Sequence, residues 1–261
     1  MIKVGIIGGS GFDDPQLIEN IKRIKKHTPY GATSDFPVIG SYQGREVIIL
    51  ARHGEGHRIP PSRVNFRANI WAMKELGVTH ILATTAVGSL REEIKPGHLV
   101  FPDQFIDRTT QRQSTFFEGN EVCHISMAEP FCPKLGLKLS EAAEGLGFTY
   151  HSQGTIITIE GPRFSTRAES HMFRQWGADI INMSTVPEVV LAREAGICYA
   201  TIAMSTDYDC WHESETSVTW EMIAEVMKRN VENVKRLLFA VIPQIEYQEC
   251  ECRDAIKKAM V

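Results

Sequence analysis

The sequence has no large excess of charge of either sign and no long apolar run. Its 28 lysines and arginines stand against 32 aspartates and glutamates, so the formal net charge is −4, and the basic surface of an electrostatic nucleic-acid binder is not expected. The longest stretches without Asp, Glu, Lys or Arg, such as 76–90, run 15 residues, short of the roughly 20 apolar residues that span a bilayer. We therefore predict no nucleic-acid and no membrane partner. The first residues lack the pattern of a secretory signal, so we expect a cytoplasmic location.

The six cysteines include no C-x-x-C pair, which excludes a zinc ribbon. Cys198 and Cys210 lie in or beside apolar runs, as buried thiols do. Cys250 and Cys252 form a C-x-C pair in a polar C-terminal segment. In an ordinary reducing cytosol these two would be free thiols, whereas in a heat-adapted cell they could form a disulfide. The sequence leaves both alternatives open.

The composition is that of an ordinary globular protein, with 43% hydrophobic and 23% charged residues in 261. It excludes a disordered chain, a collagen-like repeat and a disulfide-stabilised miniprotein. Periodicity predicts strands over 3–8, 46–51, 80–85, 99–106, 155–159, 180–183 and 197–204, and helices over 65–75, 135–146, 165–176, 187–195 and 219–241. No linker interrupts this alternation. We therefore predict an α/β fold, a single domain with a central mixed β-sheet flanked by helices.

A glycine-rich run, 8–11, follows the first predicted strand but completes no nucleotide-binding fingerprint. Asp14 stands where the third glycine of G-x-G-x-x-G would fall, and no Gly-Lys-Ser/Thr occurs anywhere in the chain. Its backbone N–H groups and the hydroxyl of Ser10 could bind an anion, or the run could be a plain glycine turn. An NAD-dependent oxidoreductase is therefore a weak rival interpretation.

The next two strand ends add further anion-binding groups. Arg52 offers a bidentate fork for phosphate, with His53 beside it. His57 lies four residues after His53, but two glycines between them argue against a metal-binding helix, and a solvated loop is the plain alternative. Thr84 and Thr85 bring hydroxyls to the third strand end. Because ligands gather at the carboxyl ends of strands in α/β sheets, these groups together predict a phosphate dianion with no metal.

A pair of acids, Asp207 and Asp209, follows the most apolar predicted strand. If the backbone stays extended, both carboxyls point to one side. A desolvated carboxyl with a raised pKa could donate to a ring nitrogen, and an ionised one could accept from an amine. A glycosidase also uses paired carboxyls, but that function would not explain the phosphate-like elements. Alternatively, the two acids lie in a surface loop and cap a helix, without a catalytic role.

Two further segments place an aromatic and a thioether after strands. Phe164 could stack on a flat ligand or fill the core, and Met183, beside Ser184, suits a sugar face or core packing. Neither residue decides between these roles by itself.

Several stretches together resemble the 5′-methylthioadenosine phosphorylases, in the trimeric class of purine nucleoside phosphorylases. The similar stretches are 5–15, 51–57, 65–77, 84–93, 103–110, 127–133, 158–170 and 181–211. The resemblance implies a pentosyltransferase of purine and methionine salvage. With phosphate as cosubstrate and no cofactor, it converts 5′-methylthioadenosine to adenine and 5-methylthioribose 1-phosphate. It also implies a phosphorylase domain over residues 1–245 and a C-terminal tail over 246–261.

The resemblance assigns residues to three roles. Phosphate binding falls to Ser10, Arg52, His53, Thr85, Ala86 and Ser184, and catalysis at the base to Asp207 and Asp209. Nucleoside binding falls to Phe164, Ser165, Met183, His124, Trp220 and Ile223. His124 would reach the site of a neighbouring subunit, which implies a homotrimer or a dimer of trimers.

Two alternatives stay open beside this function. A broad-specificity purine nucleoside phosphorylase would accept adenosine, inosine or methylthioinosine, although an acid rather than an amide at Asp207 favours adenine over a 6-oxopurine. A nucleotide-binding module would bind the same ligands without turnover.

Overall fold

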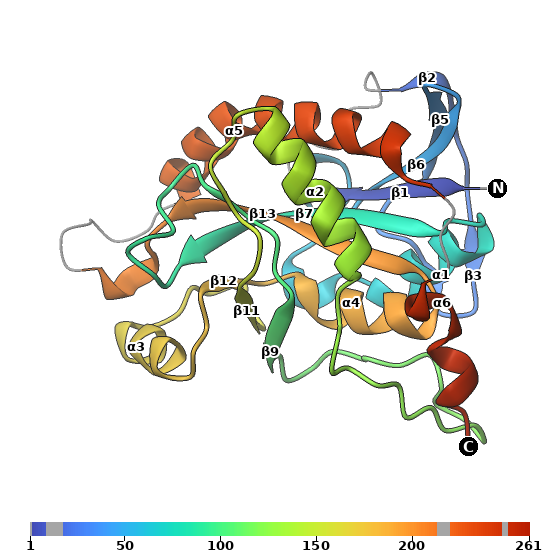
Figure 1. Ribbon diagram of the computed structural model, residues 1–261. Coiled ribbons are helices and arrows are strands. Elements are labelled where there is room, and N and C mark those ends of the chain that lie inside the picture. The colour runs from blue at the N-terminus through green and yellow to red at the C-terminus, as the bar shows by residue number, and fades with distance from the viewer. Residues whose placement is uncertain (1, 9–17, 213–219, 247–249) are drawn as a thin grey trace.

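The computed structural model describes residues 2–8, 18–212, 220–246 and 250–261, and the side chains of all of these except 220–229 (Figure 1). The strands are β1 Lys3–Gly8, β2 Glu19–Arg23, β3 His27–Thr28, β4 Gly31–Ala32, β5 Val38–Tyr42, β6 Arg45–Ala51, β7 His80–Ser89, β8 Leu99–Val100, β9 Gln104–Arg108, β10 Tyr150–His151, β11 Thr155–Ile159, β12 Ile180–Asn182 and β13 Cys198–Asp207. The α-helices are α1 Phe66–Glu75, α2 Pro133–Gly145, α3 Arg167–Gln175, α4 Thr185–Glu194, α5 Trp220–Val241 and α6 Glu251–Asp254. No helix within these described ranges is long and apolar enough to cross a membrane.

Eleven of the described strands form one mixed sheet in the order β10-β8-β13-β7-β1-β6-β5-β2, with β12, β11 and β9 branching from β7. The four central strands, β13, β7, β1 and β6, are parallel, so their carboxyl ends share one edge. The outer pairs β5–β6 and β2–β5 are antiparallel. The predicted single α/β domain with a central mixed sheet is confirmed.

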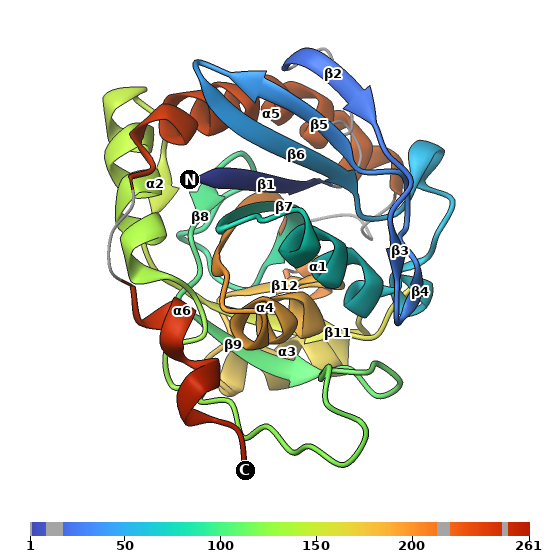
Figure 2. The ribbon, with the colours of Figure 1, turned by 90° about the vertical axis from the view of Figure 1, so that its right-hand side faces the viewer.

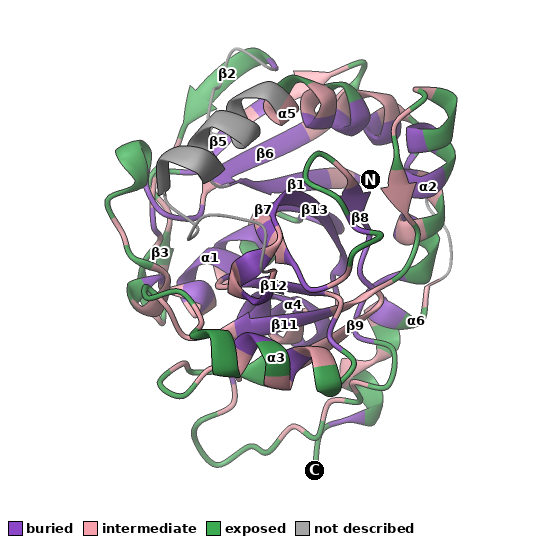
Figure 3. Ribbon diagram, turned by 90° about the vertical axis from the view of Figure 1, so that its left-hand side faces the viewer, coloured by how far each residue is buried: buried purple, intermediate pink, exposed green. Residues whose placement is uncertain are grey.

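Strand β13 shows how the sequence builds two layers of core. Its residues are buried on both faces, as expected for a central strand of a parallel sheet. Cys198, Ala200 and Ile202 pack in the cluster that contains buried residues of α2 and α5. Tyr199 and Ala203 pack in the second cluster, with α1 and α4. Helices therefore cover both faces of the sheet, as Figures 1 and 2 show, and the strands lie buried between them (Figure 3).

One predicted strand was wrong, and several strands, β2 among them, were not predicted. The stretch 99–106 is not one strand, because the chain leaves the sheet at Phe101-Pro102 and re-enters as β9 beside β11; proline cannot donate a ladder hydrogen bond. Strand β2 was not predicted, because all five of its residues are exposed and show no alternation.

The C-terminal tail packs against the body of the domain. Cys252 is buried in the α2–α5 cluster, and the Arg193 guanidinium of α4 donates to the Cys252 sulfur at 3.3 Å. Near the end of the chain, the backbone N–H of His124 donates to the Ala259 carbonyl at 2.8 Å. These contacts fix the tail beside the amino ends of the central strands, away from the edge described next.

Candidate active site

A cavity of about 500 Å³ opens at the carboxyl ends of the central strands. Ten of the residues predicted from the sequence line it: Arg52, His53, Thr85, Ala86, Phe164, Ser165, Met183, Ser184, Asp207 and Asp209. They come from the ends of β6, β7, β11, β12 and β13. The topology brings them together because parallel strands deliver their carboxyl ends to one edge.

Four predicted residues are not placed in this cavity. Ser10 lies outside the described residues, and the side chains of Trp220 and Ile223 also lie outside them. His124 is described, but it is an exposed residue of the long connection between β9 and α2 and does not line the cavity. Its predicted partner is a neighbouring subunit, so it stays a prediction.

The Arg52 guanidinium is held in a buried ion pair that the sequence analysis did not foresee. Its Nε and Nη2 groups donate to the two carboxylate oxygens of Glu188, each at 2.8 Å. The side chains are 2% and 0% exposed. Burial alone would lower the pKa of Arg52, but the charge and hydrogen bonds of Glu188 outweigh it and raise the pKa. Arg52 is therefore charged and fixed, with Glu188 occupying the fork expected to bind phosphate.

Backbone and tyrosine groups complete the surroundings of this pair. Arg52 Nη1 donates to the Thr84 carbonyl at 2.9 Å, and Nη2 also lies 3.5 Å from the Ile7 carbonyl. The Tyr199 hydroxyl donates to Glu188 at 2.8 Å. A guanidinium has five N–H groups, and four have these protein acceptors. Within the part of the chain that the structure describes, the second N–H on Nη1 meets no protein acceptor, so Arg52 can there give a ligand a single hydrogen bond rather than a bidentate clamp.

A cluster of hydroxyls forms the polar floor of the cavity. Thr85 Oγ1 and Ser184 Oγ lie 3.0 Å apart, and the Asn182 amide donates to them at 3.1 and 3.4 Å. The Thr158 hydroxyl donates to the Asn182 carbonyl oxygen at 2.9 Å, which fixes the amide orientation. The amide also donates to Thr185 Oγ1 at 2.8 Å. Because one of the two hydroxyls donates to the other, and Thr85 Oγ1 also lies 3.2 Å from the Ala86 carbonyl, one hydroxyl proton of the pair can turn toward an anion.

His53 presents a neutral imidazole to the cavity. Its Nδ1 lies 2.9 Å from the Ile59 carbonyl, and a carbonyl can only accept, so the proton sits on Nδ1 and Nε2 is an acceptor. The ring stacks on His57 with centroids 4.3 Å apart. Burial, followed by the charge of Arg52, lowers the pKa of His53 to about 4. His53 can therefore accept a hydrogen bond from a ligand while it stays uncharged near neutral pH.

The two acids share the cavity, but not by the extended geometry expected. Strand β13 ends at Asp207, and Asp209 begins a short 3-10 turn with φ +40°. The backbone N–H of Asp209 donates to Asp207 Oδ2 at 3.0 Å, and the Thr206 hydroxyl donates to Asp207 Oδ1 at 2.6 Å. A left-handed residue therefore folds the chain back and brings both carboxyls to one wall. For a non-glycine residue this conformation is unfavourable and common at functional sites.

Ser165 and Gly88 keep this wall in place. The Ser165 hydroxyl lies 2.9 and 2.8 Å from the two carboxylate oxygens of Asp209. Burial raises the pKa of Asp209, and this hydrogen bond opposes the rise. A Cβ atom on Gly88 would lie 3.1 Å from Asp207 Oδ2 and 3.2 Å from the Asp209 Cβ. Only a glycine on β7 lets the carboxyls approach the sheet this closely.

Two residues that organise the cavity, Asn182 and Glu188, were not predicted from the sequence. Asn182 ends β12 and Glu188 lies in α4, and both are nearly or fully buried. The signal was present: a carboxylate inside the apolar run TVPEVVLA requires a buried partner. The sequence pattern could not identify that partner, because Arg52 lies 136 residues away in the chain.

The assembled cavity has two chemically different ends. One end offers hydroxyls and one N–H of Arg52, which suit an anion of phosphate size. The other end offers two carboxyls, and Phe164, a residue that is 43% exposed, lines the same cavity. Met183 lines the space together with both groups. The arrangement can hold an anion and a flat, hydrogen-bonding heterocycle at the same time.

Comparisons with known proteins give the family. A family model described as the phosphorylase superfamily matches residues 3–243. The S-methyl-5′-thioadenosine phosphorylase of Danio rerio is 57% identical over 249 residues, covering 94% of this chain and 89% of that protein. That of Thermofilum pendens is 54% identical over 261 residues, covering 100% and 99%. The methylthioadenosine phosphorylase of Schistosoma mansoni, solved in complex with adenine, superposes with a TM-score of 0.93 at 43% identity, covering 99% and 96% of the two chains. The chain belongs to the S-methyl-5′-thioadenosine phosphorylase family of the phosphorylase superfamily.

Proposed function

We propose that this protein catalyses the phosphorolysis of 5′-methylthioadenosine to adenine and 5-methylthioribose 1-phosphate. The observation that carries the proposal is that one cavity holds both an anion-binding hydroxyl cluster, Thr85 and Ser184, and an acid pair, Asp207 and Asp209. Membership of the family supports the same reaction. The enzyme is a pentosyltransferase that uses inorganic phosphate as cosubstrate and no organic cofactor.

The reaction divides between the two ends of the cavity. Breaking the bond between the sugar and the purine builds positive charge on the ribose ring, and the electron pair of that bond leaves with the purine. A phosphate held by Thr85, Ser184 and an N–H of Arg52 stabilises the ribose charge and supplies the oxygen that bonds to the anomeric carbon. Met183 lies along the ribose and limits its movement. A proton or hydrogen bond delivered to the purine stabilises the departing anion.

Glu188 limits how much charge Arg52 contributes to phosphate binding. Because the Arg52–Glu188 pair is close to neutral as a unit, the phosphate does not meet a full buried positive charge. We propose that binding therefore depends on the hydroxyls, on backbone N–H groups before α4 and on His53 as acceptor from a protonated phosphate oxygen. This arrangement gives the phosphate dianion enough affinity to be positioned for reaction, without the very tight binding that would slow its release.

The acids recognise the base. We propose that Asp207 interacts with N7 and that Asp209 accepts from the 6-amino group of adenine, with Phe164 and Ser165 beside the ring. The pKa of Asp209 is the one raised by burial, which gives a specific reason to test the exchanged assignment, with Asp209 as the proton donor. The variants Asp207→Asn and Asp209→Asn separate these assignments by pH dependence. Base preference alone does not separate them, because N7 is common to adenine and the 6-oxopurines, whereas replacing the proton donor to N7 should remove the basic limb of kcat/KM.

We further propose a homotrimer or a dimer of trimers, in which His124 reaches the 5′ end of the substrate bound by a neighbouring subunit, with Trp220 and Ile223 in the same pocket. The exposed position of His124 beside Val122, which is 49% exposed, supports a contact with another chain. We also propose a cytoplasmic location, which the six free thiols support. Light scattering of the purified protein tests the assembly, and cell fractionation tests the location.

One assay tests the function directly. The enzyme is incubated with 5′-methylthioadenosine with and without phosphate, and the products are separated by chromatography. We expect adenine and 5-methylthioribose 1-phosphate in equal amounts, and only with phosphate. Adenine release independent of phosphate would indicate a hydrolase, and ligand binding without turnover would indicate a binding module. Equal or faster turnover of inosine would replace the proposed substrate with that of a broader phosphorylase.

A further inference from the structure

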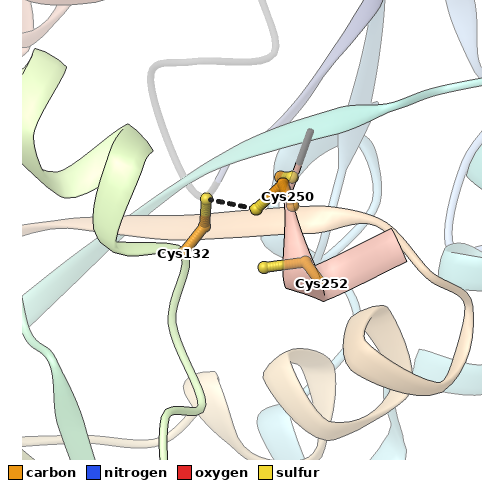
Figure 4. A group of neighbouring side chains, drawn as sticks. Cys132, Cys250 and Cys252 are labelled. Carbon is orange, nitrogen blue, oxygen red and sulfur yellow. Dashed lines mark hydrogen bonds between the residues drawn. The ribbon is translucent and has the colours of Figure 1, made fainter. Parts of the chain in front are cut away.

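Four of the six cysteines meet at the amino end of the central strands. Cys132 precedes α2, Cys198 begins β13, and Cys250 and Cys252 lie at the start of α6. Their four sulfur atoms all lie within 4.8 Å of one another. Figure 4 shows the sulfurs of Cys132, Cys250 and Cys252 directed toward one small space between the elements. The fold thus places thiols of segments far apart in the chain side by side; Cys132 and Cys250, for example, are separated by 118 residues.

We propose that these four cysteines form a mononuclear tetrathiolate site for a thiolate-preferring divalent metal ion, with Zn²⁺ as the best match. Zinc binds sulfur at about 2.3 Å in a tetrahedron, which places neighbouring sulfurs about 3.8 Å apart. The sulfurs of Cys132 and Cys250 are 3.7 Å apart. The widest pair, at up to 4.8 Å, would close by about 1 Å, a change within the reach of side-chain rotation.

The surroundings suit such a site. Cys132, Cys198 and Cys252 are 2%, 0% and 3% exposed, so a metal bound there would be shielded from water, as in closed structural zinc sites. A small cavity of about 20 Å³ lies against Cys132, Cys198 and Cys250. This is enough space for one ion beside the sulfurs and far too little for an organic ligand.

The charge around the cluster also favours thiolates. A divalent ion with four thiolates carries two excess negative charges, which need compensation in a buried place. The Arg193 guanidinium donates to the Cys252 sulfur at 3.3 Å, and Lys134 and Lys138 line the small cavity. These second-sphere cations would stabilise the charged complex and tune its affinity.

The geometry distinguishes this site from a pair of disulfides. A disulfide needs sulfurs about 2.05 Å apart in a specific dihedral arrangement, and all six cysteines are free in the structure. Here all four sulfurs lie within 4.8 Å of one another, and those of Cys132 and Cys250, at 3.7 Å, are well beyond the length of a disulfide bond. Mutual proximity of four sulfurs is the requirement of a tetrahedral ion rather than of two separate bonds.

A metal at this place would fasten the C-terminal tail to the domain. Two ligands come from the tail and two from the body, at Cys132 and Cys198. The opposite end of β13 carries Asp207, so the site lies at the far edge of the sheet from the cavity. The expected role is therefore stabilisation of the fold and not participation in phosphorolysis.

The first test measures metal content and coordination on the full chain. Protein purified under reducing conditions is stripped with a chelator and titrated with Zn²⁺ or Co²⁺ alone. We expect one Zn²⁺ per chain by elemental analysis, the intense visible absorption of tetrahedral tetrathiolate Co²⁺, and a Tm raised by about 5–10 °C at a hundredfold excess over the dissociation constant.

Variants make the assignment specific. Cys250→Ser and Cys252→Ser should each remove the Co²⁺ spectrum and the Zn²⁺-dependent rise in Tm, whereas Cys123→Ser, outside the cluster, should keep both. Unchanged phosphorolysis by the Cys250 and Cys252 variants shows that they fold. Absence of stoichiometric metal from the wild type would overturn the proposal, as would a mass and thiol count showing that the four cysteines of the reduced-buffer protein are paired as disulfides. A Co²⁺ spectrum that survives in Cys252→Ser would overturn it equally.

Discussion

The two ends of strand β13 differ in almost every physical respect. At its carboxyl end, Asp207 and Asp209 are buried carboxyls held by directed hydrogen bonds, one of them in a left-handed conformation. At its amino end, Cys198 is a fully buried thiol among other thiols. The carboxyl end holds groups in conformations that cost stability, whereas the amino end gathers groups that join distant segments. Substitutions at the first end should therefore change kinetics, and substitutions at the second should change stability.

Glu188 is the largest expected exception to this division, because it lies at the carboxyl edge but supports the fold. Glu188→Ala leaves the Arg52 charge buried without its partner, and we expect a loss of about 3–5 kcal/mol in the free energy of unfolding. Denaturant unfolding measures it. Glu46→Gln is the matched control, because the Lys3–Glu46 pair is partly exposed and should cost less than about 1 kcal/mol. Similar losses for both variants would contradict the structural role of the Arg52–Glu188 pair.

Asp207 should show the opposite behaviour, a large kinetic effect with little change in stability. We expect Asp207→Asn to lower kcat/KM for 5′-methylthioadenosine at least about 100-fold, since proton transfer to a leaving group contributes on this scale. Relative preference should move toward inosine-type substrates, because an amide beside N7 can also donate to the adjacent 6-oxo group, whereas a carboxylate cannot. Steady-state kinetics on both substrates measure the change, with Asp254→Asn in the exposed tail as control. Equal rates of variant and wild type on both substrates would refute the role of Asp207.

Gly88 tests the close approach between β7 and the acid pair. In Gly88→Ala the new methyl group meets Asp207 Oδ2 and Ile181 Cγ2, both at 3.1 Å. We expect a loss of about 1–3 kcal/mol in stability together with lower kcat/KM, because overpacking displaces the carboxyls. Gly136→Ala in α2 is the matched control, because its Cβ meets nothing within 4 Å and it should slightly stabilise the helix. If Gly88→Ala changed neither stability nor kcat/KM, the packing of the acid pair against β7 would not be tightly constrained.

Ser165 should have a smaller effect, visible mainly in the pH profile. Its hydroxyl stabilises the ionised form of Asp209, whose pKa is already raised by burial. Ser165→Ala removes that donor and should raise the Asp209 pKa further, so the acidic limb of kcat/KM moves to higher pH with a loss of about tenfold. Ser165→Thr retains the hydroxyl and should restore the limb. If the acidic limb of the kcat/KM pH profile did not shift in Ser165→Ala, ionisation of Asp209 would not limit the reaction.

His53 should produce the smallest effect on pH dependence. With its pKa lowered to about 4, the folded protein holds a neutral imidazole from pH 5 to 8. The unfolded chain binds a proton below about pH 6.5, so His53 contributes stability that is fully present above that pH and is lost as pH falls toward 4. Carbon-detected NMR of the labelled imidazole measures the pKa directly. Titration near 6.5 in the folded protein would contradict the buried environment described here.

Many of the strands and helices, and the gathering of many of the site residues in one cavity, could be predicted from local sequence patterns. The strand Lys3–Gly8 and the strand Thr155–Ile159 were predicted to the residue, because buried parallel strands leave strong apolar signals. The gathering of Arg52, Thr85 and Asp207 followed from the rule that parallel strands end at one edge. The turn at Asp209 and the partner of Arg52 were not predictable, since neither a left-handed residue nor a long-range ion pair leaves a periodic mark.

The sequence by itself determined which residues stand at strand ends, and with that the family and the chemical groups brought to the site. It could do so because apolar periodicity is local and family resemblance is spread along the chain. Only the tertiary structure decided what each group faces: that Glu188 takes the fork of Arg52, that Asn182 orients two hydroxyls, and that four scattered cysteines meet. Such partners are set by distances between segments far apart in the chain, and no spacing within one segment encodes them.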